Sequence, residues 1–272
     1  MIEYLNGEKL YGDDFSIEQI EKWYKEESEG YANLGSNNQA NYSYSYHNLN
    51  NRYAFSKLSD KKFDNVLGFG AAYGFEFEPI VDKISSLTII EPSDKLVRKT
   101  IGSLTPTYVK PAIDGKIDFQ DNSFDLITCF GTMHHIPNVS FVISEFARVI
   151  KPGGIILLRE PISSMGDWTK PRLGLTKHER GIPPKTFDYI INSNSLKIVS
   201  KNYCLTMTSA LQREIGKFFK KPLHYYKSYL FIDIILSKLF TWNFCYHPTK
   251  KTQRIAPSSI FYVLRKEQTH KI

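Results

Sequence analysis

The sequence predicts an α/β protein in which a seven-stranded, mostly parallel sheet carries helices on both faces. Three observations favour this class. From residue 64 onward, short apolar runs alternate with segments that have helical spacing. Gly68, Gly70 and Gly74 make a turn directly after the first apolar run. The second apolar run ends at Glu91, at the kind of strand tip where parallel α/β sheets bind their ligands.

The N-terminal segment, residues 1–58, is expected to form a lid of helices and loop. Ser16, followed by Gln19 three residues later, is a helix N-cap signal in front of an amphipathic segment. Residues 30–47 are rich in Asn, Ser and Tyr, which favours a loop. We expect Tyr42 and Tyr46 to line a ligand cleft, although tyrosines on a loop surface explain the same pattern.

The main α/β domain is predicted to comprise residues 59–205 and 256–267. Its strands are expected at 64–69, 87–91, 107–109, 124–130, 154–160, 196–204 and 259–265. Its helices are expected at 74–84, 93–101, 138–150 and 184–193. Residues 206–255 interrupt this alternation with two helical segments, of which 225–242 is strongly apolar. We expect this insertion to cap the open end of the sheet.

The charge distribution is uneven along the chain, whose net charge is +7. Residues 1–30 hold nine acids and three bases, whereas residues 197–272 hold fourteen bases and three acids. A basic C-terminal third is typical of proteins that bind an anionic substrate, a membrane surface or a nucleic acid. A solvated basic surface without a partner explains the same pattern. The three cysteines are far apart and lack metal-ligand spacing. With neither a signal peptide nor a long apolar run evident, we expect a cytoplasmic protein without a metal.

Five motifs, in the same order, resemble those of the class I S-adenosylmethionine-dependent methyltransferases. The resemblance extends over residues 60–205 and 257–266. It implies a Rossmann-like fold and methyl transfer from that cofactor to a small molecule. The matching segments are the glycine turn at 66–74, Glu91, the approach to the fourth strand at 119–127, the His-His run at 133–136, and residues 145–158 with their Lys-Pro-Gly-Gly turn.

The resemblance also implies a set of cofactor-binding residues. Glu91 is expected to accept hydrogen bonds from the ribose, and Asp114 from the adenine amino group. The whole expected set is Gly68, Phe69, Gly70, Ala71, Gly74, Glu91, Pro92, Asp114, Phe130 and Gly131. Two positions depart from the family pattern, because Gly68 stands in place of an aspartate and Ala72 in place of a glycine. Alanine is tolerable there if its φ angle is negative.

The catalytic candidates follow the predicted strand ends. His134 and His135 come directly after the central strand, and histidine is the side chain best suited to accept a proton near neutral pH. We expect one of them, with His135 preferred, to act as general base for a hydroxyl acceptor. Glu160, at the end of the next strand, is a second candidate. Alternatively, one histidine packs in the core and the other orders the loop.

Substrate residues are expected in the long polar segment 159–183. Its bases would bind phosphate, with Arg172 and Arg180 as the preferred anchors, and Trp168 would stack on a sugar or base. The bases in this segment are Arg159, Lys170, Arg172, Lys177, His178 and Arg180. We therefore expect O-methylation of a sugar, phosphosugar or nucleotide sugar, by analogy with methyltransferases of bacterial surface-polysaccharide pathways.

Other functions are weighed against this one. A lipid or quinone methyltransferase would explain the apolar, lysine-flanked segment 225–242, which suits a peripheral membrane contact. A nucleic-acid enzyme would need a recognisable RNA-binding module. A nicotinamide dehydrogenase would share the glycine turn but leave the histidine pair and the Lys151-Pro-Gly-Gly turn unexplained. The non-enzyme alternative is a cofactor-binding scaffold.

Overall fold

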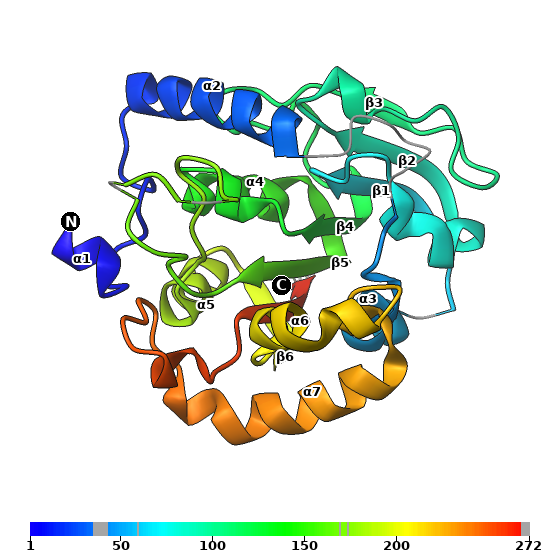
Figure 1. The fold of residues 1–272 in the computed structure, drawn as a ribbon. Helices are drawn as coiled ribbons and strands as arrows, with labels where there is room; N and C mark the ends of the chain where they lie inside the picture. The colour runs from blue at the N-terminus through cyan, green and yellow to red at the C-terminus, as the bar shows by residue number, and fades with distance from the viewer. Residues whose placement is uncertain (35–42, 59, 169, 173, 268–272) are drawn as a thin grey trace.

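The computed structural model describes residues 1–34, 43–58, 60–168, 170–172 and 174–267. A seven-stranded sheet with the order β3-β2-β1-β4-β5-β7-β6 forms its centre (Figure 1). Strand β7 is antiparallel to both of its neighbours, and the other pairs are parallel. The predicted fold class is confirmed. The strands are β1 (Phe63–Phe69), β2 (Ile84–Ile90), β3 (Thr107–Val109), β4 (Phe124–Phe130), β5 (Ile150–Pro161), β6 (Leu196–Cys204) and β7 (Ser259–Lys266).

The central strands are nearly continuous apolar runs because helices cover both faces of the sheet. One core cluster packs β4 and β5 against α4 (Val139–Val149) and α5 (Pro184–Asn192). The cluster on the opposite face contains side chains from α3 (His47–Tyr53) and from the 3₁₀ helix η3 (Phe75–Lys83). This two-sided burial fixes where the carboxyl ends of β1, β2, β4 and β5 meet.

The helix predicted at 93–101 is wrong. Only a short 3₁₀ helix, η4 (Asp94–Leu96), forms there, and Val97 already has an extended backbone. The two buried side chains of this stretch, Leu96 and Ile101, lie five residues apart, which is not the spacing of a helical stripe. Ile101 instead pairs with Leu104 in an isolated bridge.

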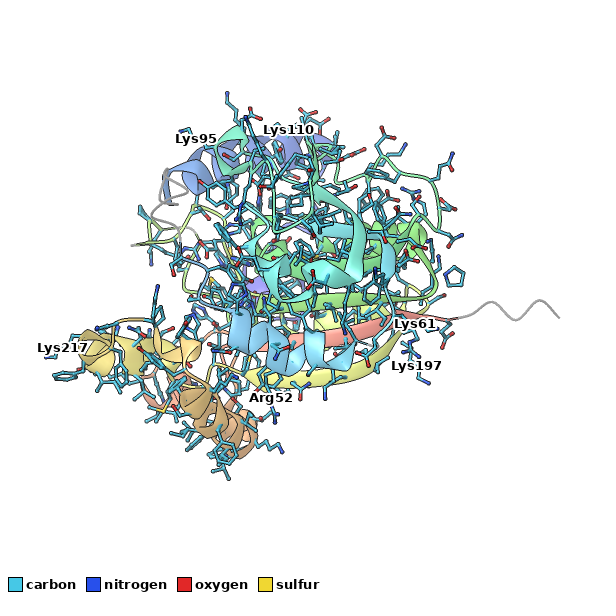
Figure 2. The ribbon with its side chains drawn as sticks, turned by 90° about the vertical axis from the view of Figure 1, so that its right-hand side faces the viewer. Arg52, Lys61, Lys95, Lys110, Lys197 and Lys217 are labelled. Carbon is cyan, nitrogen blue, oxygen red and sulfur yellow. The ribbon has the colours of Figure 1, made fainter. Side chains whose placement is uncertain are left out.

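Residues 17–34 of the N-terminal segment lie at the opposite end of the molecule from residues 227–240 of the insertion (Figures 1 and 2). After the short α1 (Ile2–Leu5), helix α2 (Ile17–Leu34) begins where predicted, and the Gln19 side chain accepts the Ser16 N–H. The insertion contains α6 (Thr208–Ile215) and α7 (Lys227–Phe240). Short 3₁₀ helices complete the described chain: η2 (Phe55–Lys57), η5 (Met133–His135), η6 (Gly216–Phe218), η7 (Leu223–Tyr225), η8 (Thr241–Asn243) and η9 (Thr252–Arg254).

The α6–α7 block protrudes from the α/β body, as Figure 2 shows from the side. Ser45, just before α3, and Asn48, within α3, hydrogen-bond to His224 and Tyr225 of this block. In the part of the chain that the structure describes, every helix is too short or too polar to cross a bilayer.

Candidate active site

Two cavities meet at the carboxyl ends of β1 and β4, and both are lined by Gly70 and Gly131. The first, here called the α2 pocket, has a volume of about 820 Å³ and is partly walled by helix α2. The second, the Arg159 cleft, is a more open space of about 1370 Å³. Residues from β1, β2, β4 and the loops that follow them therefore reach a single connected site, as expected for an open α/β sheet.

Glycine is required where the two strand-end loops approach each other. Gly70 has a φ angle of +67°, and a Cβ atom there would lie 2.2 Å from Cγ2 of Thr132. Gly131 has a φ angle of +75°. Because no larger residue fits at position 70, the backbone of this loop stays open to a ligand.

The missing motif aspartate has a structural explanation at Gly68. A Cβ atom at this position would lie 2.8 Å from the ring of Phe77, so the space for an aspartate is filled by an aromatic side chain. Other contacts order the loop: the Gly70 N–H donates to the Ile90 carbonyl over 2.8 Å, and the Thr132 hydroxyl donates to the Phe69 carbonyl over 3.2 Å. Gly68 itself lines neither cavity.

The condition for a tolerable alanine at position 72, a negative φ angle, is not met, because its φ angle is +48°. Its backbone is held on both sides: the Ala72 N–H donates to the carboxylate of Glu91 over 3.1 Å, and its carbonyl accepts the Tyr108 hydroxyl over 3.0 Å. These bonds stabilise a conformation that alanine adopts at a cost. Gly74 also has a positive φ and packs against Ile101 rather than lining a cavity.

Glu91 is buried at the end of β2 and lines the α2 pocket. Its two oxygens accept the N–H groups of Ala72 and Ser93 over 3.1 and 3.0 Å. Burial raises the pKa of this carboxyl to about 7 despite these bonds. Each carboxylate oxygen has a second lone pair, so Glu91 retains the capacity to accept a hydroxyl of a ligand.

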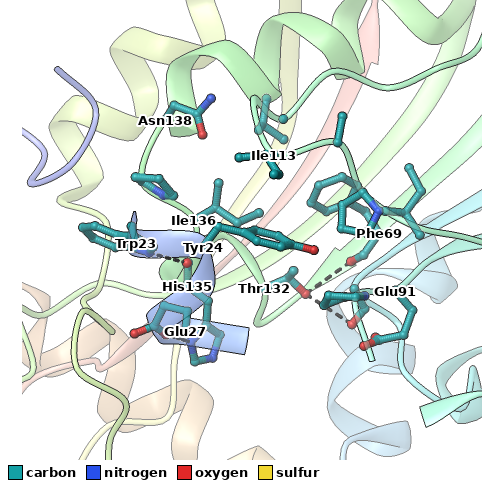
Figure 3. Close-up of a pocket in the computed structure, with 18 of the residues that line it drawn as sticks. Trp23, Tyr24, Glu27, Phe69, Glu91, Ile113, Thr132, His135, Ile136 and Asn138 are labelled. Atoms are coloured by element: carbon teal, nitrogen blue, oxygen red, sulfur yellow. Dashed lines mark hydrogen bonds and ion pairs between the residues drawn. The ribbon is translucent and has the colours of Figure 1, made fainter. Parts of the chain in front are cut away.

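Asp114 does not occupy the position expected of it. Its exposed side chain accepts the Lys116 N–H over 2.9 Å, and Ile113 and Gly115 line the α2 pocket in its place. Asn138 is the polar group on this wall. Its amide nitrogen donates to the Asp114 carbonyl over 2.7 Å, while its buried oxygen has no hydrogen-bond partner among the described residues. Figure 3 shows this oxygen turned towards the interior of the pocket.

Helix α2 supplies the opposite wall with Trp23, Tyr24 and Glu27, none of which the sequence singled out. The Trp23 indole donates to the His135 carbonyl over 2.7 Å (Figure 3). The same indole stacks on His178, with the ring centroids 4.4 Å apart. The one sequence feature that could have indicated this wall is the four-residue spacing of Trp23 and Glu27, which places both on one face of the helix.

His134 lies between two carboxylates. Its Nδ1 is 2.8 Å from Glu160 and its Nε2 is 3.5 Å from Glu179. Burial alone would lower the pKa of His134, but the hydrogen bonds and charges of the two carboxylates outweigh it and raise the pKa to about 9. At neutral pH His134 therefore carries a proton, and a protonated imidazole cannot act as a base.

His135 has the opposite character. Burial and the charge of His134 lower its pKa, only partly offset by the hydrogen bond from its Nδ1 to Glu27 over 2.9 Å. It is a neutral imidazole at pH 7 and lines the α2 pocket. His134, His135 and Glu179 also each offer a ligand atom within 4.8 Å of the others.

Glu160 organises the loop after β4. It is fully buried and accepts the backbone N–H groups of Thr132, Met133 and His134, in addition to the His134 ring. It lines neither cavity, so the structure argues against contact between Glu160 and an acceptor.

Arg159, at the end of β5, points into the cleft named after it. Its side chain is 92% buried, and Tyr46 covers the guanidinium at 3.9 Å. One terminal nitrogen, Nη2, makes a long bond of 3.4 Å to the Phe130 carbonyl, and Nη1 has no hydrogen-bond partner among the described residues. A buried guanidinium with unused donors is a strong anion-binding group.

Glu76 lines the same cleft and was not predicted from the sequence. It accepts the Thr128 hydroxyl over 2.5 Å, and burial raises its pKa to about 7 in spite of the nearby Arg159 charge. The cleft is therefore lined by two groups that are cationic at neutral pH, Arg159 and His134, and by one carboxyl that ionises near pH 7.

The two arginines expected to anchor the substrate are already engaged. Fully buried Arg180 donates to the carbonyls of Tyr11, Met133, Ile136 and Pro137. Arg172 donates in the same way to the carbonyls of Met165, Thr176, Lys177 and Glu179. Both guanidinium groups fasten backbone segments together, and neither lines either cavity. The Nε of Arg172 has no hydrogen-bond partner among the described residues, but it is buried away from both cavities.

The remaining substrate candidates divide in the same way. Trp168 is buried and stacked on Tyr11 at 4.9 Å, and His178 is held by Glu26, so neither faces the Arg159 cleft. Tyr46 does line this cleft. Tyr42 lies outside the described residues. Of the cofactor candidates, Phe69, Gly70, Glu91, Pro92 and Gly131 line the α2 pocket, and Ala71 and Phe130 line the Arg159 cleft.

Comparisons with known proteins agree with this geometry. Residues 67–158 match the family described as "Methyltransferase domain". The ubiquinone biosynthesis O-methyltransferase of Dechloromonas aromatica is 27% identical over 129 residues, which are 46% of this chain and 56% of that protein. The chain thus spans little more than half the length of this curated relative.

Solved structures share the fold at low identity. An S-adenosylmethionine-dependent methyltransferase from Mesorhizobium loti aligns with 78% of this chain and 94% of its own, with a TM-score of 0.51 and 11% identity. The cyclase SpnF aligns with 93% of this chain and 98% of its own, with a TM-score of 0.54 and 13% identity. Since a cyclase shares the fold, the reaction has to be argued from the site.

In the family match, the strand order and the glycine loop with its acidic partner, residues 67–158 are similar to class I methyltransferase domains. This class takes its methyl group from S-adenosylmethionine, which is the cofactor that the family implies.

Proposed function

We propose that the protein transfers a methyl group from S-adenosylmethionine to a hydroxyl of a small, anionic acceptor. The adenosine part of the cofactor suits the α2 pocket, where Glu91 would accept the ribose hydroxyls and the unpaired oxygen of Asn138 the adenine amino group. The shared border at Gly70 and Gly131 is where the methyl group would pass from one cavity to the other.

Arg159 is the observation that carries the choice of acceptor. Its buried guanidinium has a nitrogen without a partner among the described residues and faces a cleft lined by several hydroxyl side chains. This chemistry suits a phosphate or carboxylate on a hydroxylated molecule, such as a phosphosugar or nucleotide sugar of a surface-polysaccharide pathway. The hydroxyl residues are Tyr44, Tyr46, Ser163, Ser209, Ser258 and Ser259. Ser209 belongs to α6, which supports the insertion as a cap on the acceptor side.

His135 is the proposed base. It lines the α2 pocket rather than the Arg159 cleft, so the acceptor hydroxyl would meet it at the border that the two cavities share. In the reaction the acceptor oxygen attacks the methyl carbon, the sulfur–carbon bond breaks, and S-adenosylhomocysteine leaves. The acceptor proton goes to the neutral imidazole, which Glu27 orients through Nδ1. His135→Ala should keep the affinity for the cofactor and lower turnover at least about tenfold. Normal turnover in this variant would remove His135 from the mechanism.

Kinetics and calorimetry of Arg159→Ala test the acceptor proposal. We expect the KM for an anionic acceptor to rise at least about tenfold, since a charge-assisted hydrogen bond is lost, while the affinity for S-adenosylhomocysteine stays unchanged. Arg265→Ala, a change at an exposed arginine, is the control. If Arg159→Ala instead loses the cofactor and keeps its acceptor KM, Arg159 binds the methionine carboxylate of the cofactor and the acceptor proposal is wrong.

A quinone-type lipid is the second candidate acceptor. It is favoured by the names of the curated relatives and by the exposed apolar face of α7. Methyl transfer from labelled cofactor to a panel of nucleotide sugars, phosphosugars, neutral glycosides and phenolic quinone precursors distinguishes the two. Labelling of the phenols alone would reject the sugar-type acceptor, and cofactor binding without any labelled product would favour a scaffold.

A further inference from the structure

Helix α7 buries polar side chains and exposes apolar ones, the reverse of what is expected for a surface helix. Two of its polar side chains, Asp233 and Ser237, are buried against the body of the protein. Asp233 accepts the N–H groups of Leu205 and Thr206 over 2.8 and 2.7 Å, and Ser237 bonds to the Thr206 hydroxyl. The inner face is therefore used to fasten the chain that leaves β6.

The outer face of α7 is apolar and exposed. At helical spacing, Phe231, Ile232, Ile235 and Leu239 fall on one side, and Trp242 continues that side into η8. We call these five residues the apolar strip. Their side chains are 67%, 52%, 47%, 58% and 80% exposed, respectively. A contiguous apolar surface of this kind marks an interaction site rather than an ordinary protein surface.

Basic residues border the apolar strip. Lys227 and Lys238 precede and follow Phe231 by four and seven positions, so they lie along one edge of the same face. The insertion, residues 206–255, holds nine Lys and Arg and two Asp and Glu, a net charge of +7 that equals the charge of the whole chain. Lys217, Lys220 and Lys221 lie in the same block, and none of these five lysines pairs with a carboxylate among the described residues.

We propose that the apolar strip is a peripheral membrane-binding surface for anionic phospholipids, with α7 lying parallel to the bilayer plane. An apolar face with lysines along its edge is suited to this environment, because the side chains enter the acyl boundary while the lysines meet lipid phosphates. Helix α7 has 14 residues, too few to span a bilayer. A second copy is a poor occupant, because a symmetric contact would oppose two blocks of charge +7. The proposal does not depend on the identity of the acceptor.

Trp242 is a built-in reporter for this contact. Of the three tryptophans, Trp23 and Trp168 are buried, whereas Trp242 is the exposed member of the strip. Vesicles of phosphatidylcholine with 30% phosphatidylglycerol should shift the tryptophan emission to shorter wavelength, and pure phosphatidylcholine should have little effect. The shift should vanish in Trp242→Phe. No shift and no flotation of the wild-type protein with the anionic vesicles would overturn the proposal.

Flotation of matched variants identifies the residues. Phe231→Ser with Leu239→Ser should weaken partition onto anionic vesicles at least tenfold without changing the melting temperature, because both side chains are already exposed. Tyr189→Ser, a change at an exposed aromatic on α5, is the apolar control. Lys227→Glu with Lys238→Glu should also weaken partition, whereas Lys197→Glu, on a different face (Figure 2), should not.

Two outcomes would overturn the proposal at this stage. One is that the strip variant partitions like the wild-type protein. The other is that the wild-type protein sediments as a dimer that the strip variant converts to a monomer, while neither binds vesicles; the strip would then be an interface between copies of the chain.

Discussion

Glu91 shows how one buried carboxylate serves both the protein and a ligand. It holds the Ala72 N–H of the glycine loop and also faces the α2 pocket. Loss of this side chain removes an acceptor for the ribose and loosens the loop. We expect Glu91→Ala to lose roughly 1–3 kcal/mol of binding free energy for S-adenosylhomocysteine, measured by calorimetry. Unchanged affinity in a folded variant would contradict the assignment.

The same residue predicts a pH dependence of cofactor affinity. Burial raises the pKa of Glu91 to about 7, so the carboxyl is largely protonated at pH 6 and ionised at pH 8. The ionised form is the better acceptor for two ribose hydroxyls, so affinity should increase as the pH rises through 7. Glu91→Gln, which cannot ionise, should show a flat profile over this range.

His134 predicts a pH dependence of stability with the opposite direction. Its pKa is raised to about 9 in the folded protein, from an ordinary value of 6.5. The folded state then binds the proton more tightly, so its contribution to stability is complete below pH 6.5 and is lost as the pH rises to 9. His134→Gln should cost about 2–4 kcal/mol in the free energy of unfolding at pH 6 and less at pH 9, measured by urea denaturation. A difference independent of pH would mean that His134 is neutral in the folded state.

At the scale of elements, the connection from β6 to α7 depends on Asp233. Leu205 and Met207 both have positive φ angles, of 61° and 55°, and Asp233 bonds to the two backbone N–H groups at positions 205 and 206. Asp233→Ala leaves these buried donors without an acceptor, so we expect a loss of about 1–3 kcal/mol in the free energy of unfolding. Asp233→Asn, which keeps one acceptor oxygen, should lose less. Equal stability of Asp233→Ala and the wild-type protein would contradict this account.

The elements of the sheet are predictable from the sequence because their signals are local. The run Phe124–Phe130 is apolar except for Asp125 and Thr128, because both faces of β4 are covered. The glycine turn after β1 needs positive φ angles. The helix expected at 93–101 fails for the complementary reason: good helix-forming residues are present there, but no buried stripe supports them.

Site residues, too, were predictable where their signals are local in the sequence, and not where they depend on tertiary contacts. Gly70, Glu91 and Gly131 follow from motifs at strand ends, and all three line the α2 pocket. The arginines of the segment after β5 look equivalent in the sequence. What separates Arg159 from Arg180 is which carbonyl groups the fold brings near each guanidinium, and this depends on residues more than 100 positions away, such as Tyr11. Trp23 was missed because its role also depends on a distant contact, with the His135 carbonyl 112 positions away. Asn138 was missed because its orientation depends on the Asp114 carbonyl, 24 positions away in a different loop.

At the scale of the whole molecule, acidic and basic residues are concentrated at opposite ends. Helix α2, from the acidic N-terminal segment, and the basic α6–α7 block lie at opposite ends in both views (Figures 1 and 2). Residues 1–30 hold nine acids and three bases, in contrast to the net +7 of residues 206–255. An anionic membrane would therefore attract one end of the protein and repel the other, which fixes its orientation on the surface.

Because the proposed membrane contact combines charge and apolar surface, the salt concentration should separate an electrostatic contribution to binding from an apolar one. The Debye length falls from about 14 Å at 0.05 M salt to about 4 Å at 0.5 M, so attraction between the lysines and lipid phosphates is largely screened at the higher concentration. The apolar contact of Phe231 and Leu239 is not screened. Flotation of the wild-type protein should weaken at least about tenfold between these concentrations but stay above background. Phe231→Ser with Leu239→Ser should bind only at low salt. Lys227→Glu with Lys238→Glu should show a weaker salt dependence than the wild-type protein, because the net charge of residues 206–255 falls from +7 to +3. A wild-type protein that detaches completely at 0.5 M salt would mean that charge alone holds it to the surface.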